Sequence, residues 1–278
     1  MELNAETLSL FGQFLIKEEK SRNTVEKYIR DANTFLSFAY GQAVSKELTL
    51  AYKERLTGLF AISSINSMLA ALNTFLDFLG FGDCKVKPLK TQRRLFASED
   101  KQLSQEAYEK MIALAKKEGK ERLCIVMQTL CNTGIRISEL AYITVEAVQA
   151  GKVTVNCKGK IREIFIHDQL RELLLGYIRK TGARTGSVFV TRNGKSLDRS
   201  NLWREMRELS RRADVDKEKV FPHNLRHLFA RTYYQFKKDI ARLADVLGHS
   251  NIQTTRIYIQ TSGNEYRSEL AGLGLMGT

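Results

Sequence analysis

The sequence predicts a mostly α-helical protein with one small antiparallel sheet, an α+β fold divided between two domains. Through residues 4–80, apolar side chains recur at the three- and four-residue spacing of amphipathic helices. The same spacing returns after residue 104, where glycines end one segment and Ser or Asp residues can cap the next. Within residues 145–166 the period changes to two: VTVNC and IREIFI alternate as strands, and KGK (158–160) forms a tight connection.

The N-terminal part is expected to form a four-helix domain over residues 1–83. Asn4 can cap a first helix and Ser21 a second, because a side-chain oxygen at that position accepts a hydrogen bond from an otherwise unpaired N–H. A third helix is expected near residues 46–60. Ser63 or Ser64 then opens a fourth, which Gly80 ends.

A basic segment follows this domain. The run CKVKPLKTQRR at 84–94 holds five Lys or Arg residues, no acidic residue and one of the chain's two prolines. It is typical of an extended linker, which we place at residues 84–97. Two interpretations stay open: a solvated hinge, or a connector that lies along the phosphates of a DNA duplex.

Residues 98–278 form the expected second domain, and each of its helices has a start signal. Ser104 caps a helix that runs to about Lys117, and a second helix covers 121–132. Asp168 can cap a later helix, SVFV at 187–190 is expected as a short strand, and a further helix covers 198–213. Pro222 suits the first turn of the next helix, where its missing N–H costs nothing.

The charge balance points to a polyanionic partner. The 278 residues carry a net charge of +13. Residues 1–97 hold 13 basic and 10 acidic residues, and residues 98–278 hold the other 31 and 21, so the second domain carries most of the excess. No apolar run reaches the 18 residues of a membrane span, and MELNAETLSL lacks a signal-peptide start, so a cytosolic protein away from the membrane is expected. Four cysteines without a C-x-x-C pair are expected to be reduced packing thiols.

Two polar runs near the C-terminus carry the chemistry. The runs are PHNLRH at 222–227 and LGHSNIQTTRIY at 247–258. They contain an arginine, whose guanidinium can make two parallel hydrogen bonds, and histidines, whose imidazoles can donate an N–H. They also contain a tyrosine after a polar turn, where it can reach solvent or a ligand. Such a set fits attack on a phosphodiester, since charge grows on the phosphate oxygens during displacement. Alternatives are a packing role for Tyr258 and a metal site at His223 and His227, although the zinc-protease Glu is absent.

Three sequence boxes together resemble the tyrosine recombinases of the phage integrase family, with the Xer-type enzymes most similar. The boxes are TGIRISEL (133–140), PHNLRHLFA (222–230) and LGHSNIQTTRIY. In order and spacing they supply the family's catalytic set, namely Arg136, His223, Arg226, His249 and the nucleophile Tyr258. A surface ion pair between Arg136 and Glu139 is the alternative for the first box.

The resemblance implies a helical core-binding (SAM-like) domain followed by a catalytic domain. It implies that Tyr258 forms a 3′-phosphotyrosine, and that a lysine of the β-hairpin protonates the leaving 5′ oxygen. Lys158 is the matching position and Lys160 is a rival. Strand exchange would proceed through a four-way junction in a tetramer on double-stranded DNA, without metal or nucleotide cofactor, with the apolar tail 269–276 docking on a neighbouring protomer. A partner recombinase or accessory protein is compatible with this. A type IB topoisomerase and a non-cleaving DNA-binding protein on this scaffold are the alternative functions.

Overall fold

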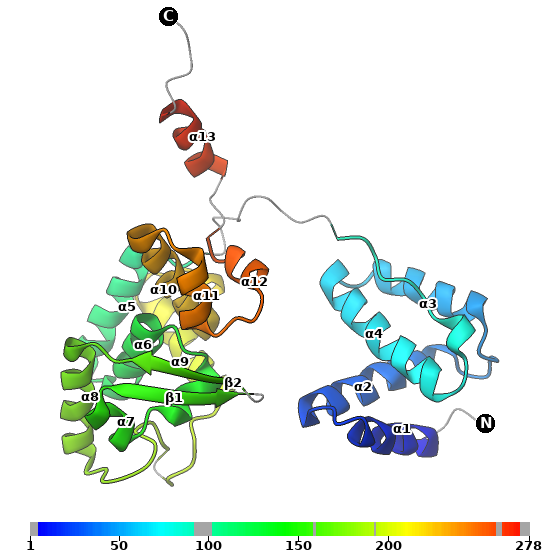
Figure 1. Cartoon of the computed structure of the whole chain (residues 1–278), viewed down its shortest axis with the longest axis horizontal. Coiled ribbons are helices and arrows are strands. Elements are labelled where there is room, and N and C mark those ends of the chain that lie inside the picture. Colours follow the sequence, from blue (N-terminus) through cyan, green and yellow to red (C-terminus); the bar gives the residue numbers. More distant parts are fainter. Residues whose placement is uncertain (1–4, 92–101, 158–159, 192, 260–262, 273–278) are drawn as a thin grey trace, which may run out of the picture. The chain divides into compact units, whose positions relative to one another are not determined.

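The computed structural model describes residues 5–91, 102–157, 160–191, 193–259 and 263–272, in two compact units, 1–93 and 94–278 (Figure 1). Each unit has its own hydrophobic core. The mostly helical fold with a small antiparallel sheet is confirmed, because the described strands form one two-stranded sheet. In the described part of the chain, no helix has the length and apolar content of a membrane span.

Four helices build the first unit: α1 (Ala5–Lys17), α2 (Arg22–Phe38), α3 (Lys46–Thr57) and α4 (Ile62–Phe78), followed by the 3₁₀ turn η1 (Gly82–Cys84). Ser21 caps α2 as predicted, with its hydroxyl accepting from the Thr24 amide. The expected cap of α4 is wrong. This helix begins at Ile62 after Ala61, which makes no side-chain cap bond, and both candidate serines lie inside it. The core of Phe11, Phe35 and Phe75 holds the helix in place instead.

Residues 84–90, the first part of the basic segment, are bound to α3 and α4 of this unit. Asn73 donates to the Val86 carbonyl (2.9 Å) and accepts from its amide (2.9 Å). Asn66 does the same for Leu89, at 2.9 and 2.7 Å. Asn66 and Asn73 are seven residues apart on a helix, and Val86 and Leu89 are three residues apart in an extended segment. Both separations correspond to ~10 Å, so the two asparagine side chains match the two backbone positions. Residues 92–97 of the expected linker lie outside the described residues.

Asn73→Ala is expected to destabilise the first unit by about 1–3 kcal/mol, because it leaves both polar groups of the buried Val86 backbone unpaired. In the double variant Asn66→Ala/Asn73→Ala, the Val86 and Leu89 amides should exchange their hydrogens faster than in the wild type. Asn33→Ala, at an exposed position on α2, is the matched control. Unchanged protection of the two amides in the double variant would contradict this assignment.

The second unit packs helices around α6 and carries the sheet on one side. Its helices are α5 (Gln105–Lys117), α6 (Glu121–Thr133), α7 (Val145–Ala150), α8 (Asp168–Thr181), α9 (Arg199–Arg212), α10 (Pro222–Lys237), α11 (Ile240–Leu247), α12 (Ile252–Arg256) and α13 (Gly263–Gly272). The 3₁₀ turns are η3 (Ile137–Tyr142) and η4 (Lys217–Lys219). The predicted cap Ser104 and the first-turn Pro222 are confirmed, and the structure adds Asp198 and Asp239 as the caps of α9 and α11.

Three sequence expectations for this unit are wrong. Residues 145–150, at the start of the expected period-two region, form α7, capped by Thr144. His167 caps α8 in place of Asp168, since its Nδ1 accepts from the Leu170 amide. The segment 187–190 makes isolated bridges to Thr144 and Ser196 and is not a strand, because no extended neighbour runs alongside it among the described residues.

The hairpin consists of β1 (Lys152–Cys157) and β2 (Lys160–Phe165), paired antiparallel from Lys152↔Phe165 to Cys157↔Lys160. Ile161 and Phe165 point outward and are 70% and 74% exposed. Because strand side chains alternate, Arg162 shares the inward face with the buried Ile164. Lys158, the expected proton donor, lies outside the described residues, and of Lys160 only the backbone pairing is described.

Candidate active site

The first turns of α10 bring two of the predicted residues to one face. Pro222 begins this helix after the extended Phe221, so the helix direction is set before the polar residues follow. His223 and Arg226 are three residues apart and therefore lie on the same side. Their helix packs on α6, whose end carries the first sequence box.

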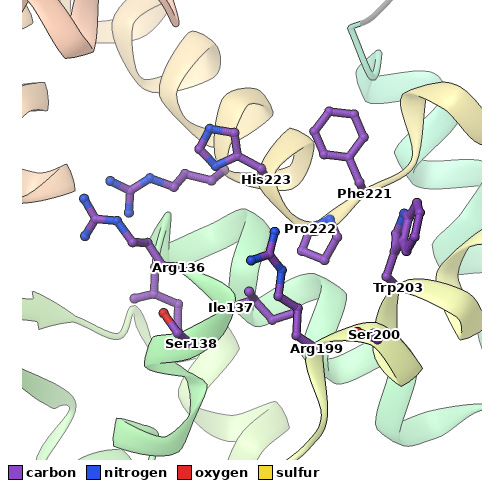
Figure 2. Close-up of a pocket in the computed structure, with 11 residues that line it drawn as sticks. Arg136, Ile137, Ser138, Arg199, Ser200, Trp203, Phe221, Pro222 and His223 are labelled. Carbon is purple, nitrogen blue, oxygen red and sulfur yellow. The ribbon is translucent and has the colours of Figure 1, made fainter. Parts of the chain in front are cut away.

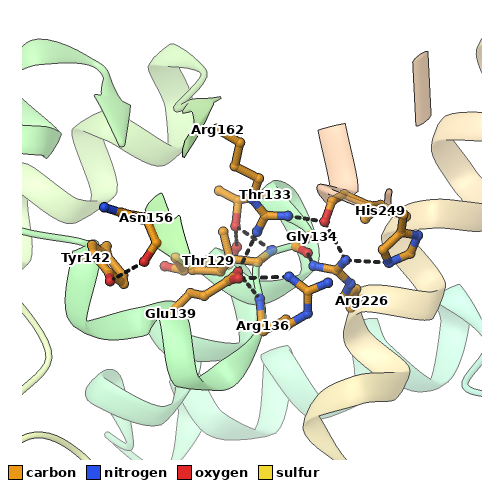
Figure 3. A network of polar contacts seen from close by, with 12 residues as sticks. Thr129, Thr133, Gly134, Arg136, Glu139, Tyr142, Asn156, Arg162, Arg226 and His249 are labelled. Carbon is orange, nitrogen blue, oxygen red and sulfur yellow. Dashed lines mark hydrogen bonds and ion pairs between the residues drawn. The ribbon is translucent and has the colours of Figure 1, made fainter. Parts of the chain in front are cut away.

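Arg226 is the centre of the polar network in Figure 3 and is only 1% exposed. Its Nη1 donates to the Gly134 carbonyl (2.6 Å) at the end of α6, and Nη2 donates to the Leu247 carbonyl (2.7 Å) at the end of α11. Helix C-termini carry partial negative charge, so these two ends stabilise a buried cation. Burial and then the charge of Arg136 lower the pKa of Arg226 to about 10, which leaves it protonated at neutral pH.

The glycines in the first and third boxes make this arrangement possible. Gly248 adopts φ 67° and closes α11 in a Schellman motif, with its amide donating to Asp245 (2.9 Å) and the His249 amide to Ala244 (2.9 Å). The Leu247 carbonyl is thereby left free for the side-chain donor. Gly134 adopts φ 62°, and a Cβ there would lie 2.4 Å from the Phe229 ring. Larger residues at either position would move the carbonyls away from Arg226.

Arg136 begins η3 and forms the ion pair that the sequence left as an alternative. Its Nη1 donates to Oε1 of Glu139 (2.9 Å), and its amide donates to Oε2 (2.8 Å). Glu139 is only 3% exposed, whereas the Arg136 side chain is 39% exposed. Arg136 also lines a pocket with Arg226 and His223, so the ion pair anchors one end of a guanidinium that still faces the site.

The bonds of His249 define its tautomer. An arginine can only donate, so Nε2 of His249 accepts from Nη2 of Arg226 (2.9 Å). Nδ1 must then carry the proton, which it donates to the Thr255 hydroxyl (2.9 Å). Burial and then the charge of Arg226 lower the pKa of His249 to about 4. The imidazole is therefore neutral at neutral pH in this arrangement.

Tyr258 lies in a cage of three histidine rings. The centroids of His227, His249 and His223 lie 4.2, 5.5 and 5.7 Å from that of the tyrosine. Its hydroxyl is 3.4 Å from Nε2 of His223 and also interacts with the Arg226 side chain. The expectation that the tyrosine reaches solvent is wrong, because the residue is 5% exposed. Helix α12 and the residues after it fold the phenol back against α10.

A pocket of about 810 Å³ opens beside these residues (Figure 2). Its lining includes Arg136, Arg199, Trp203, Phe221, His223 and Arg226. Arg199, at the first turn of α9, makes no ion pair or hydrogen bond with another described residue. Its charge still reaches His223, since burial and then the charges of Arg226, Arg136 and Arg199 lower the pKa of that histidine. The pocket therefore combines Arg136 and Arg226 from the sequence boxes with Arg199, which forms no ion pair or hydrogen bond with another described residue.

Sequence reasoning missed several residues that the structure brings into the site. Arg199 and Arg162 lie outside the boxes, and only their positive charge in a basic chain pointed to them. His227 was considered as a metal ligand, yet its ring packs against His223 (4.7 Å) and Tyr258, and burial and then His223 lower its pKa to about 4. Within the described part of the chain, no group of three His, Cys, Asp or Glu side chains is arranged to hold a metal.

The model of the phage integrase family matches residues 101–265, which is more than half of the sequence. The chain belongs to the phage integrase family. Among curated members, tyrosine recombinase XerA of Pyrococcus furiosus is 28% identical over 282 residues, which cover 99% of this chain and 96% of that protein. XerC of Erythrobacter litoralis is 29% identical over 85% of this chain and 81% of the relative. This family member is a Xer-like tyrosine recombinase, an enzyme of site-specific recombination.

Solved structures agree in fold. The crystal structure of XerA recombinase is 25% identical, covers 98% of this chain and 99% of its own, and has a TM-score of 0.55. XerH bound to its difH substrate before cleavage reaches a TM-score of 0.70 at 16% identity, covering 98% of this chain and 95% of its own. A λ integrase tetramer bound to a Holliday junction has a TM-score of 0.72 at 16% identity, over 91% and 76%. At these two lower identities the likeness concerns the fold.

Proposed function

We propose that this recombinase cuts and rejoins duplex DNA by transesterification at Tyr258. The observation that carries the proposal is the convergence of the three sequence boxes: Arg136, His223, Arg226 and His249, from η3, α10 and the end of α11, surround one tyrosine and one pocket. Two guanidinium groups and a hydroxyl next to a neutral imidazole are the groups that phosphoryl transfer requires.

In the proposed first step, the Tyr258 hydroxyl oxygen forms a bond to the scissile phosphorus while the bond from phosphorus to the 5′ oxygen breaks. The product is a 3′-phosphotyrosine ester and a free 5′ hydroxyl. His223 is placed to accept the phenol proton through Nε2. Lys158 is proposed to donate a proton to the leaving oxygen, and Lys160 stays the alternative. Reversal with another 5′ hydroxyl rejoins the strand, so the ester stores the bond energy.

Arg136 and Arg226 are proposed to bind the non-bridging oxygens. Arg226 has an Nε–H without a partner among the described residues, and a buried arginine with an uncommitted donor fits an anion site. His249 now presents a lone pair at Nε2 to Arg226, so it must take up a proton there before it donates to a phosphate oxygen. A bound phosphate favours this, since nearby negative charge raises a histidine pKa.

Binding of double-stranded DNA and assembly into a tetramer belong to the same proposal. The net charge of +13 supports a DNA partner. The related XerH is bound to its difH substrate, and the related λ integrase forms a tetramer on a Holliday junction. We infer strand exchange through such a four-way junction for this chain.

The test of the proposed function is a nicked DNA substrate whose short fragment diffuses away after cleavage. The expected result is a covalent adduct of the protein with the 3′ end of the DNA, formed in the presence of a chelator. Peptide analysis should locate the attachment at Tyr258. Exchange of strands between two duplexes would separate a recombinase from a topoisomerase, which relaxes supercoiled DNA. Absence of any adduct on cognate DNA would overturn the proposal.

Arg199→Gln is expected to weaken DNA binding and to reduce the slope of log K against log salt concentration by about 1, because one phosphate contact is lost. The residue lines the pocket and has no described protein partner to lose. Arg179→Gln, an exposed change on α8, is the control of equal charge, since α8 contributes no residue to the pocket. Equal slopes for the two variants would show that Arg199 does not contact phosphate.

A further inference from the structure

Strand β2 points the charged side chain of Arg162 toward the residues of the candidate site. Arg162 occupies an inward-facing position of this strand, next in the alternation to the buried Ile164, where an apolar residue is the rule. Its side chain is only 12% exposed. A charged residue that breaks the pattern of a buried face marks a functional or strained position.

Arg162 contacts two groups that belong to the catalytic boxes. Its Nη2 donates to Oε2 of Glu139 at 2.5 Å, and its Nη1 donates to the Leu247 carbonyl. Glu139 is the residue that anchors Arg136, and the Leu247 carbonyl also accepts from Arg226. One side chain on the hairpin therefore joins the supports of both catalytic arginines (Figure 3).

The path of this side chain accounts for the glycine of the third box. A Cβ on Gly248 would lie 2.7 Å from both Cδ and Nη1 of Arg162. Heavy atoms cannot approach so closely, and the left-handed φ of 67° disfavours other residues as well. Gly248 thus leaves the space through which Arg162 reaches the end of α11.

Charge balance indicates what Arg162 does for Arg136. Glu139 is buried, so its charge needs compensation, and it now receives it from two guanidinium groups. Arg136 commits only Nη1 of its side chain to this carboxylate. Without Arg162, both carboxylate oxygens of Glu139 would be available to the Arg136 guanidinium, and carboxylates favour such a bidentate pair with arginine. Both of the Arg136 nitrogens in that pair would then face Glu139 instead of the pocket.

We propose that Arg162 is a positioning residue for DNA cleavage, which occupies Glu139 and the Leu247 carbonyl so that the guanidinium of Arg136 stays available to the scissile phosphate. This inference rests on the proposed function, since it assigns Arg136 to the phosphate. It adds a residue of β2 to the support of the site and connects the hairpin mechanically to η3 and α11.

The test compares Arg162→Gln with the wild-type recombinase on the nicked substrate. Adduct formation should slow by roughly 100-fold, because a catalytic group that is displaced by about 1 Å loses about that much rate, while DNA affinity stays within about threefold. Arg162→Lys, which keeps a charge for Glu139, should recover part of the rate. Arg162→Met, which keeps the length of the side chain but removes its charge and donors, should reproduce the loss if Arg162→Gln folds poorly.

Arg171→Gln is the matched control, because Arg171, like Arg162, donates to two acceptors through its guanidinium. Its acceptors are the carbonyls of Val148 and Gln149, and it lies on α8, which contributes no residue to the pocket. It should lower the melting temperature without slowing cleavage. In a Glu139→Gln background, Arg162→Gln should cost much less than in the wild type, since no carboxylate remains to attract Arg136. Independent, multiplying effects of the two changes, or a rate loss in Arg171→Gln equal to that in Arg162→Gln, would overturn the proposal.

One readout does not depend on cleavage. In the ¹⁵N NMR spectrum of the DNA-free protein, Arg162→Gln should slow rotation of the Arg136 guanidinium, because both Glu139 oxygens now bind it. If wild type forms no adduct, the proposed function fails, and this measurement alone decides about Arg162. Unchanged rotation in Arg162→Gln would overturn the inference even where the recombinase cleaves normally.

Discussion

Tyr258→Phe is expected to abolish the covalent adduct on the nicked substrate and to leave DNA binding intact. The change removes one oxygen, which is the atom proposed to attack phosphorus, and leaves the three histidine rings around it in place. The phenyl ring keeps its packing against His227 at 4.2 Å. The measurement is adduct formation over hours, with DNA affinity determined by gel shift.

The stability of this variant serves as its control. The hydroxyl approaches His223 at 3.4 Å and also interacts with the Arg226 side chain, so its loss should change the free energy of unfolding by about 1 kcal/mol. Tyr233 and Tyr234 are the nearest candidates for a different nucleophile, and both pack beside the same small core. An adduct that persists in Tyr258→Phe, or that maps to one of these or to Tyr266, would refute the assignment.

The second large effect is expected for Arg226→Lys. A lysine keeps the charge but loses the fork that reaches Gly134, Leu247 and His249 together. We expect cleavage to slow on the order of hundredfold or more, because the developing charge on the phosphate loses a bidentate partner. Single-turnover cleavage with saturating protein measures this directly.

Two comparisons separate a catalytic loss from a folding defect. Arg231→Lys alters another arginine of α10, one that donates to Gln102 and the Leu103 carbonyl outside the pocket, and should leave cleavage nearly unchanged. A substrate with a 5′-thio leaving group, which needs no proton, should not rescue Arg226→Lys, although it should rescue Lys158→Ala. Rescue of the arginine variant by this substrate would assign proton transfer, and not charge stabilisation, to Arg226.

Local chemistry made much of the second unit predictable. Ser104, Asp198 and Asp239 accept hydrogen bonds from backbone amides within three residues, so a short sequence window contains all the atoms involved. The same holds for Pro222, whose ring sets its own backbone angle. Local signals failed elsewhere: packing outweighed capping at Ser63 and Ser64, and His167 took the cap position expected of Asp168. Residues 145–150 formed α7, and 187–190 lacked the neighbour that a strand needs from elsewhere in the chain.

The sequence by itself determined which residues are proposed as the catalytic set, because Arg136, His223, Arg226, His249 and Tyr258 follow a spacing that needs no structure to be recognised. Only the tertiary structure decided how they are held. Packing of Tyr258 against His223 and His227, the sharing of the Leu247 carbonyl and the inward turn of Arg162 all join residues more than twenty positions apart. Such contacts depend on how helices and strands pack, and a linear pattern of residue types does not encode which atoms then meet.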